Sequence, residues 1–311
     1  MTAVPPTPGG RGPPSSVAAV QNRWILGARP RTLPAAVVPV AVGTAAAVGE
    51  GQPLALWRAL AALVVSLAIQ VGVNYANDYS DGIRGTDDVR VGPVRLVASG
   101  LATAAEVKRA AFAAFGVAAV FGTAVAVAAG WQLLIVGAAC IAAAWFYTGG
   151  PRPYGYRGLG EAFVFVFFGL VATMGTTYAL LERVTWLSLG AAVAVGLPVT
   201  ALLVANNLRD IPTDATSGKR TLAVRLGDRS TRFFYVALVV AAFVIVPLVA
   251  GLGLRPLAAI ALVAVAIARR PVVTVLSGAR GPALIPVLVD TGKLHLVFGL
   301  ALALGLWLSA L

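Results

Sequence analysis

Two short acidic clusters carry the residues of this chain whose spacing is suited to chemistry. The first begins Asn74-Tyr-Ala-Asn-Asp78-Tyr-Ser-Asp81 and continues to the acidic pair Asp87-Asp88. Residues three or four apart share one helix face, so Asn74, Asp78 and Asp81 are expected to lie together as catalytic residues. Crowded carboxylates at the end of an apolar helix repel one another and are costly to desolvate. A divalent cation removes this conflict, and Mg²⁺, with Mn²⁺ as a substitute, prefers oxygen ligands.

The second cluster reads Asn206-Asn207-Leu-Arg-Asp210-Ile-Pro212-Thr-Asp214 and repeats the spacing of four. Pro212 disfavours a regular helix across the second interval. The repetition predicts two carboxylate groups that face each other across a cavity. The alternative for either cluster is a polar helix end in water. The metal ligands predicted from both clusters are Asp78, Asp81, Asp87, Asp210 and Asp214.

Basic residues follow each cluster, and they favour a phosphate-bearing ligand. Arg84 follows the first cluster, and Lys219 and Arg220 follow the second. Cations and Lys or Arg side chains around one cavity are suited to a diphosphate, because metals bridge carboxylate to phosphate and side chains pair with the remaining oxygens. The alternative for the basic residues is anchoring at a membrane surface. Asn206 and Asn207 complete the predicted binding residues beside the second cluster.

The elements that must position these clusters are membrane helices. Of 311 residues, 59% are hydrophobic and 12% charged, which excludes an ordinary soluble globular protein. The net charge of +12 comes from Lys and Arg dispersed between apolar runs, so we expect no nucleic-acid partner. The single cysteine, Cys140, excludes a disulfide framework. The chain is predicted to be an all-α polytopic membrane protein, with about nine helices around a central cavity.

Nine apolar runs approach the length that crosses a bilayer. They are 33–49, 54–76, 105–129, 131–148, 159–181, 186–207, 233–252, 254–270 and 294–311. With this arrangement 21 of the 24 Lys and Arg fall on the side of the N-terminus, which predicts a cytoplasmic N-terminus in the cell membrane and a site that opens to the cytoplasm. Residues 1–22 are predicted to be a disordered cytoplasmic tail, and 23–311 one transmembrane domain.

The ordered motifs resemble those of the UbiA superfamily of intramembrane prenyltransferases, and within it the branch that acts on 1,4-dihydroxy-2-naphthoate in menaquinone synthesis. That superfamily carries Asp-rich motifs after the second and sixth of nine transmembrane helices. One departure is that Asp81 follows Asp78 by three residues rather than four, which leaves Asp81, Asp87 and Asp88 as alternatives for completing the metal shell. The matching stretches are ARPRTLPAAVVPV (28–40), NYANDYSDGIRGTDD (74–88), GPVRLVASG (92–100), YTGGPRPYGYRGLGE (147–161) and NNLRDIPTDATSGKRTLAVRLG (206–227).

The resemblance implies transfer of a polyprenyl group from its diphosphate to an aromatic acid, with loss of diphosphate and, for the naphthoate, of CO₂. Aromatic faces stabilise an allylic cation, and Tyr147 and Tyr154, together with Tyr156, are candidates for that role, with an interfacial aromatic belt as the alternative. Arg29 and Arg31 are candidates for the carboxylate of the acceptor, with membrane anchoring as the alternative.

Two further functions compete with this one. A prenyltransferase of the same superfamily with another aromatic acceptor is the first, and a secondary transporter with intramembrane acids as ion sites is the second. His295 is a candidate base but is expected to be an interfacial residue, and Glu161 is expected to favour a helix N-terminus without a chemical role.

Overall fold

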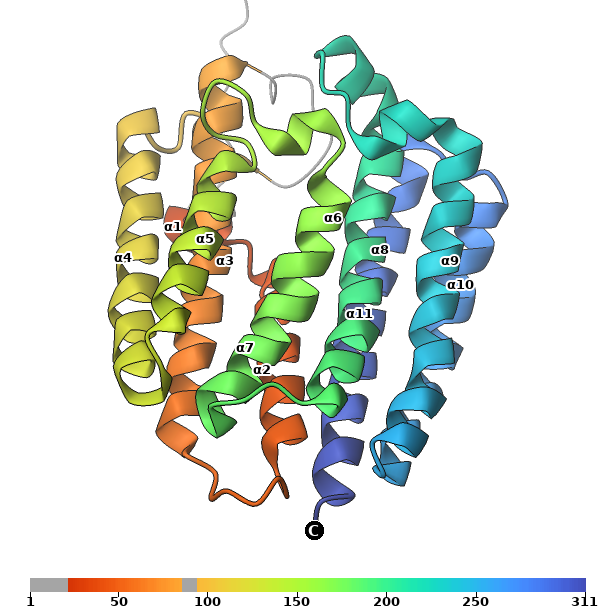
Figure 1. Ribbon diagram of the computed structural model, residues 1–311. Helices are drawn as coiled ribbons and strands as arrows, with labels where there is room; N and C mark the ends of the chain where they lie inside the picture. Colours follow the sequence, from red (N-terminus) through yellow and green to blue (C-terminus); the bar gives the residue numbers. More distant parts are fainter. Residues whose placement is uncertain (1–21, 86–93) are drawn as a thin grey trace, which may run out of the picture.

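The computed structural model describes residues 22–85 and 94–311, and within these ranges every regular element is a helix (Figure 1). The elements are α1 (Arg23–Ala28), η1 (Pro30–Thr32), α2 (Pro34–Ala47), α3 (Leu56–Arg84), α4 (Ala104–Ala129), α5 (Gln132–Phe146), η2 (Tyr154–Arg157), α6 (Gly160–Val164), η3 (Phe165–Val171), α7 (Ala172–Leu181), α8 (Trp186–Thr216), α9 (Leu222–Leu252), η4 (Pro256–Ala264), α10 (Val265–Leu276), η5 (Gly281–Leu284) and α11 (Ile285–Leu308). The predicted all-α class is confirmed. Of the predicted tail, 1–22, residues 1–21 lie outside the described residues, and Asn22 caps α1.

Among the described residues, seven helices are long and apolar enough to cross a membrane. There are also two shorter apolar helices: Pro34–Ala47 precedes the seven in the sequence, and Gln132–Phe146 lies between the second and the third. Together they correspond to the nine predicted runs, and the chain is a multi-pass membrane protein.

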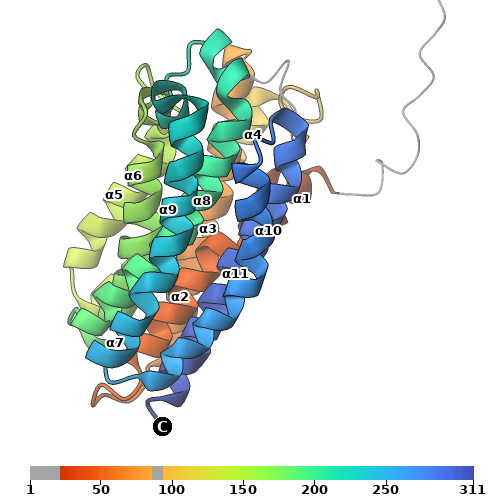
Figure 2. The ribbon, with the colours of Figure 1, turned by 90° about the vertical axis from the view of Figure 1, so that its right-hand side faces the viewer.

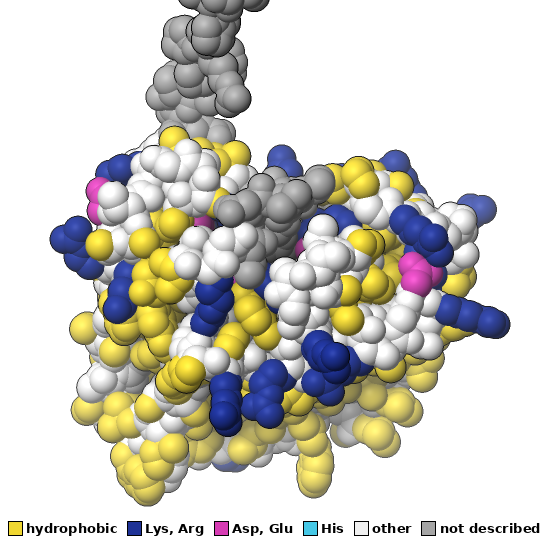
Figure 3. Space-filling model, turned by 90° about the horizontal axis from the view of Figure 1, so that it is seen from above, with side chains coloured by type: hydrophobic (Ala, Val, Ile, Leu, Met, Phe, Trp, Pro, Cys, Tyr) yellow, Lys and Arg dark blue, Asp and Glu magenta, His cyan; other side chains and the backbone are white. Residues whose placement is uncertain are grey.

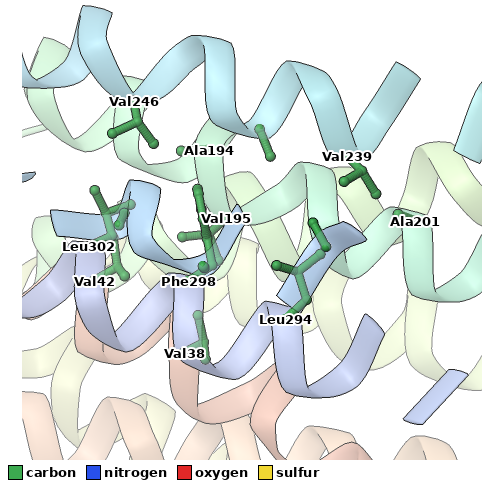
Figure 4. Close-up of a cluster of buried hydrophobic side chains, with 14 of the residues drawn as sticks. Val38, Val42, Ala194, Val195, Ala201, Val239, Val246, Leu294, Phe298 and Leu302 are labelled. Atoms are coloured by element: carbon green, nitrogen blue, oxygen red, sulfur yellow. The ribbon is translucent and has the colours of Figure 1, made fainter. Parts of the chain in front are cut away.

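Two hydrophobic cores hold the bundle together. The first joins α2, α8, α9, α10 and α11, and the second joins α3, α4 and α5. Figure 4 shows the first core, where Val38 and Val42 of α2 meet Phe298 and Leu302 of α11. A Cβ atom on Gly299 would lie 2.1 Å from Val38 Cγ1, so glycine lets α2 and α11 approach closely. In the side view of Figure 2, α9 and α10 lie toward the viewer.

Charged residues separate between the two ends of the bundle. We call the end that carries the last turns of α3 and α8 and residues 147–157 the motif end, and the other the opposite end. Lys and Arg side chains gather on the motif end (Figure 3). At the opposite end, five charged residues lie in ion pairs. The pairs are Arg58–Glu182 at 3.0 Å, Arg183–Glu50 at 3.5 Å and Arg255–Glu50 at 3.4 Å.

The helices that carry both clusters extend further than their apolar runs. Helix α3 continues to Arg84, so Asp78 and Asp81 lie within it. Helix α8 continues to Thr216 with Pro212 inside, so the expected interruption at this proline is wrong. A proline removes one backbone donor, and this loss is tolerated near the end of the helix, where Pro212 is exposed. The first cluster as far as Arg84 and the whole of the second cluster are therefore helical.

His295 differs from its predicted place. It lies inside α11 with 1% of its surface exposed, so the interfacial interpretation is wrong. The reason is that α11 begins at Ile285, nine residues before the apolar run, which shifts His295 from a helix end into the packed interior. Along the chain, the run at 159–181 also contains a π-helical segment, η3, between α6 and α7.

Candidate functional site

Asp81 of the first cluster contacts residues from two other segments. Its Oδ1 accepts a hydrogen bond from Tyr156 Oη and lies 3.5 Å from Lys219 Nζ. Both Asp81 and Lys219 are buried, so water screens their attraction weakly. The backbone N–H of Lys219 donates to the carbonyl oxygen of Asp214 at 2.9 Å. Lys219 therefore joins the two acidic clusters, one through its side chain and one through its backbone.

Asp78 has different partners. Its two carboxylate oxygens accept backbone N–H groups, Leu96 at 2.9 Å and Val97 at 3.3 Å, and the side chain is fully buried. Asn74 lies one turn earlier and donates to Ala28 O at 2.8 Å and to Thr32 Oγ1 at 2.9 Å. These two residues hold neighbouring segments against α3, while Asp81 meets the charged groups of the motif end.

Asp210 of the second cluster is paired with its own neighbour. Arg209 Nε lies 2.6 Å from Asp210 Oδ1 and Nη2 lies 2.7 Å from Oδ2. The same Nη2 donates to Asn206 Oδ1 at 2.9 Å. Arg209 and Asp210 are both buried, and a paired, hydrogen-bonded arrangement offsets part of the cost of taking two charges out of water.

Asn207 faces the start of α6. Its Nδ2 donates to Glu161 Oε1 at 2.9 Å, and both side chains are buried. The second oxygen of Glu161 has no hydrogen-bond partner among the described residues. Glu161 thus links α6 to α8 one turn before Asp210, a role that its position at a helix start did not indicate.

Residues 147–157 connect the two halves of the motif end. The Arg84 guanidinium donates to the carbonyl oxygens of Thr148 and Gly150. Thr148 Oγ1 donates to Asn77 Oδ1 at 2.8 Å. These side-chain contacts attach residues 147–157 to the last turns of α3.

Aromatic rings continue from this segment into the bundle. Tyr147 and Tyr154 pack edge to face with centroids 5.5 Å apart, and Tyr154 stacks on Phe163 at 4.0 Å. The Tyr154 hydroxyl donates to Ala143 O at 2.8 Å, and burial raises the pKa of this phenol, which keeps it neutral. Tyr154 thus packs between two aromatic neighbours, Tyr147 and Phe163.

A cavity of about 430 Å³ opens beside the second cluster. Three of its lining residues are basic, namely Lys219, Arg220 and Arg225, and none is acidic. The backbone N–H of Arg220 donates to Tyr156 O at 2.9 Å, which places the cavity next to the contacts of Asp81. A cavity lined in this way is suited to an anion.

The donor set fits a hard divalent cation in part. The carboxylates of Asp81, Asp210 and Asp214 supply the oxygen ligands that Mg²⁺ prefers. Within 22–85 and 94–311, however, no group of three or more His, Cys, Asp or Glu is arranged to hold a metal ion. Mg²⁺ is usually bound by one or two carboxylates together with substrate phosphates, and the residues present agree with that mode. Asp87 and Asp88 lie outside the described residues.

The remaining predicted residues lie beside α1. Arg29 ends α1 in a left-handed conformation at φ 51° and interacts electrostatically with Asp78. Arg31 is exposed in η1. Sequence reasoning missed the pairing of Arg209 with Asp210 and of Glu161 with Asn207. The signal for Arg209 was its place beside Asp210, whereas no local signal connects Glu161 to a residue 46 positions away.

The sequence of this chain is similar to those of known prenyltransferases. Residues 36–283 match the UbiA prenyltransferase family. The chain is 53% identical over 281 residues to a 1,4-dihydroxy-2-naphthoate octaprenyltransferase of Mycobacterium tuberculosis, which covers 90% of this chain and 95% of the relative. It is 40% identical over 230 residues to the protein of that name from Escherichia coli, covering 71% of this chain and 74% of the relative.

Solved structures share the fold at low sequence identity. A UbiA homolog from Aeropyrum pernix K1 superposes with a TM-score of 0.64 at 18% identity and covers 89% of this chain and 98% of its own. A UbiA homolog from Archaeoglobus fulgidus bound to DMAPP and Mg²⁺ gives 0.59 at 16% identity, with coverage of 92% and 99%. The family match spans most of the chain and the shared fold extends over nearly all of it, so this protein belongs to the UbiA prenyltransferase family.

Proposed function

We propose that this chain transfers a polyprenyl group from a polyprenyl diphosphate to 1,4-dihydroxy-2-naphthoate, with release of diphosphate and CO₂, as a step of menaquinone synthesis. The observation that carries the proposal is the position of Lys219, which contacts Asp81 through its ammonium and Asp214 through its backbone. A basic side chain thus lies beside one potential metal ligand, Asp81, and its backbone is bonded to the carbonyl oxygen of a second, Asp214. The names of the mycobacterial and E. coli relatives support the choice of acceptor.

The diphosphate is assigned to the basic residues of the motif end. Lys219 and Arg220 line the cavity. Arg84 donates to the carbonyl oxygen of Thr148, in the same segment, 147–157, that contacts Arg220. Mg²⁺, when bound by Asp81, Asp210 and Asp214 with Asp87, would neutralise the charge that develops on the leaving diphosphate. Asn206 and Asn207 support this region, Asn206 through Arg209 and Asn207 through Glu161. The predicted ligand role of Asp78 and catalytic role of Asn74 stay predictions.

The bond changes balance without an external oxidant or reductant. The allylic C–O bond breaks, and its electron pair leaves with the diphosphate. The ring carbon that bears the carboxylate attacks the allylic carbon and forms the new C–C bond. The bond to the carboxylate then breaks, its electron pair restores the aromatic ring, and CO₂ leaves. Tyr147, with Tyr154 behind it, presents an aromatic face to the allylic cation.

The acceptor carboxylate is assigned to Arg29 and Arg31, which precede α2. The charge separation of the bundle supports a cytoplasmic N-terminus and a site that opens to the cytoplasm, since basic residues accumulate in cytoplasmic loops. Membership in a family of prenyltransferases favours this function over an ion-coupled transporter. Another aromatic acceptor is the remaining alternative.

The test is a transfer assay with purified protein in lipid vesicles. It supplies 1,4-dihydroxy-2-naphthoate labelled at the carboxyl carbon, a polyprenyl diphosphate and Mg²⁺, and measures product mass and labelled CO₂. We expect one CO₂ per prenylated product. 4-Hydroxybenzoate and homogentisate serve as competing acceptors in parallel reactions. Faster transfer to either of them, or a naphthoate product that retains its carboxylate, would contradict the proposal.

A further inference from the structure

Tyr156 contacts two other segments of the motif end, the last turns of α3 and residues 219–220. Its hydroxyl donates to Asp81 on α3, and its carbonyl oxygen accepts the backbone N–H of Arg220 at 2.9 Å. Its ring lies 4.6 Å from Lys219 Nζ. No local spacing in the sequence relates residue 156 to residues 81 and 219, so this meeting is a product of the tertiary structure.

Lys219 has two partners that attract its ammonium. One is the Asp81 carboxylate at 3.5 Å, and the other is the face of the Tyr156 ring. The Arg84 guanidinium lies 5.6 Å from the centroid of the same ring. A cation over an aromatic face is held more strongly when it is withdrawn from water, and Lys219 is 8% exposed.

The hydroxyl and the ring of Tyr156 therefore act on different groups. The hydroxyl donates to Asp81, which fixes the direction of that carboxylate. The ring contacts the ammonium of Lys219 directly, a contact that does not pass through Asp81. Substitutions that remove the hydroxyl alone, or the hydroxyl and ring together, separate these two effects.

We propose that Tyr156 is a positioning residue that orients Asp81 for a divalent cation and Lys219 for the diphosphate, an inference that rests on the proposed function. Tyr147 instead packs against Tyr154, and Tyr154 also stacks on Phe163. Of the three tyrosines in YTGGPRPYGY, Tyr156 thus acts through the groups that bind the diphosphate, while the other two are assigned to the prenyl group.

The experiment compares Tyr156→Phe with Tyr156→Leu in purified full-length protein. We expect Tyr156→Phe to raise the Mg²⁺ concentration for half-maximal activity about fivefold, because one hydrogen bond to a charged group is lost, with little change in KM for the prenyl diphosphate. Tyr156→Leu should in addition raise that KM about tenfold, the scale of a partly desolvated cation–π contact. The KM for the prenyl diphosphate should thus stay near the parental value in the Phe variant and rise only in the Leu variant.

Binding of inorganic pyrophosphate in the presence of Mg²⁺, measured by calorimetry, provides a readout independent of turnover. The Leu variant should bind it about tenfold more weakly than the Phe variant. Tyr178→Phe and Tyr178→Leu are matched controls at the opposite end, where the Tyr178 hydroxyl lies 3.4 Å from Gln132 Oε1. They are expected to match the parent in both measurements.

Two results would overturn the inference. Equal pyrophosphate affinity in the Phe and Leu variants would mean that the ring does not hold Lys219. An unchanged Mg²⁺ requirement in Tyr156→Phe would mean that the hydroxyl does not orient Asp81. Failure of the parent to prenylate the naphthoate would instead contradict the proposed function, and the pyrophosphate comparison would still decide the role of Tyr156.

Discussion

Asp78 and Asp81 lie one turn apart on α3, yet their carboxylates have opposite kinds of partner. Asp78 accepts the backbone N–H groups of Leu96 and Val97, whereas Asp81 accepts from Tyr156 and pairs with Lys219. Backbone amides already engage both oxygens of Asp78. Asp81 is paired with side chains, which are able to exchange for a metal or a phosphate. The two acids are therefore expected to respond differently to the same substitution.

Replacing each of these acids by Asn tests the difference. In Asp78→Asn one of the two backbone donors loses its partner, which should lower the free energy of unfolding by about 1–3 kcal/mol. Asp81→Asn should leave the thermal unfolding midpoint near that of the parent and lower kcat about a hundredfold, because an anionic ligand is lost. Thermal unfolding in detergent and the transfer assay measure the two effects. A stable, inactive Asp78→Asn would instead support its predicted role as a metal ligand.

Removal of divalent metal should abolish transfer. Acidic clusters at the end of apolar helices, together with a diphosphate, need cations to offset their charge. We expect activity to vanish in excess EDTA and to return with Mg²⁺ or Mn²⁺, measured as product formed per minute. Full turnover in EDTA would refute the metal-dependent mechanism. Calcium serves as a control for nonspecific charge screening, since its larger shell fits a small octahedral site poorly.

The ion pair between Arg209 and Asp210 predicts a large effect on stability. In Arg209→Met the buried Asp210 carboxylate loses both of its guanidinium contacts, and unfolding should become easier by about 3–5 kcal/mol. The double variant Arg209→Met/Asp210→Leu should regain most of this loss, because the charges of this pair are both removed, and it should be inactive because a proposed metal ligand is lost. Thermal unfolding midpoints and the transfer assay check both expectations. A single variant as stable as the parent would show that the pair is dispensable.

The contact between Glu161 and Asn207 predicts that hydrogen bonding, rather than charge, is what α6 needs at this position. Glu161→Gln keeps an oxygen that accepts from Asn207 Nδ2 and should unfold near the parental midpoint. Glu161→Leu leaves the buried Asn207 amide without this acceptor and should cost about 1–3 kcal/mol. Equal midpoints in the two variants would contradict this reading. Glu182→Gln and Glu182→Leu, at an exposed carboxylate, are the controls.

Membrane orientation is tested with single cysteines in a Cys140→Ala background. Ser99→Cys and Ser217→Cys lie at exposed positions of the motif end, and Gln52→Cys lies at an exposed position of the opposite end. We expect an impermeant thiol reagent to label the first two from the cytoplasmic face and the third from the other face, because the motif end carries most of the basic residues. Labelling of all three from one side would refute this topology.

The sequence alone determined the class of fold and the type of site. The apolar runs are near the length that crosses a bilayer, and they predict helices, because every backbone group must be hydrogen-bonded inside the membrane. The repeated acidic clusters indicated a cation and a diphosphate, since these residue types and their spacing are local properties. Helix ends were less predictable, because polar turns at 77–84 and 208–216 continue helices whose apolar stretch has already ended.

Only the tertiary structure decided which residues of the clusters meet. Helical spacing placed Asp78 and Asp81 together, but residues 94–97 approach Asp78 and Tyr156 approaches Asp81 from elsewhere in the chain. His295 is a core residue, and Asn207 donates a hydrogen bond to Glu161. Such contacts depend on how helices pack across tens to hundreds of residues. The spacing of residues within one helix does not predict contacts between residues so far apart in the sequence, so the pairing of each side chain follows from the packed bundle.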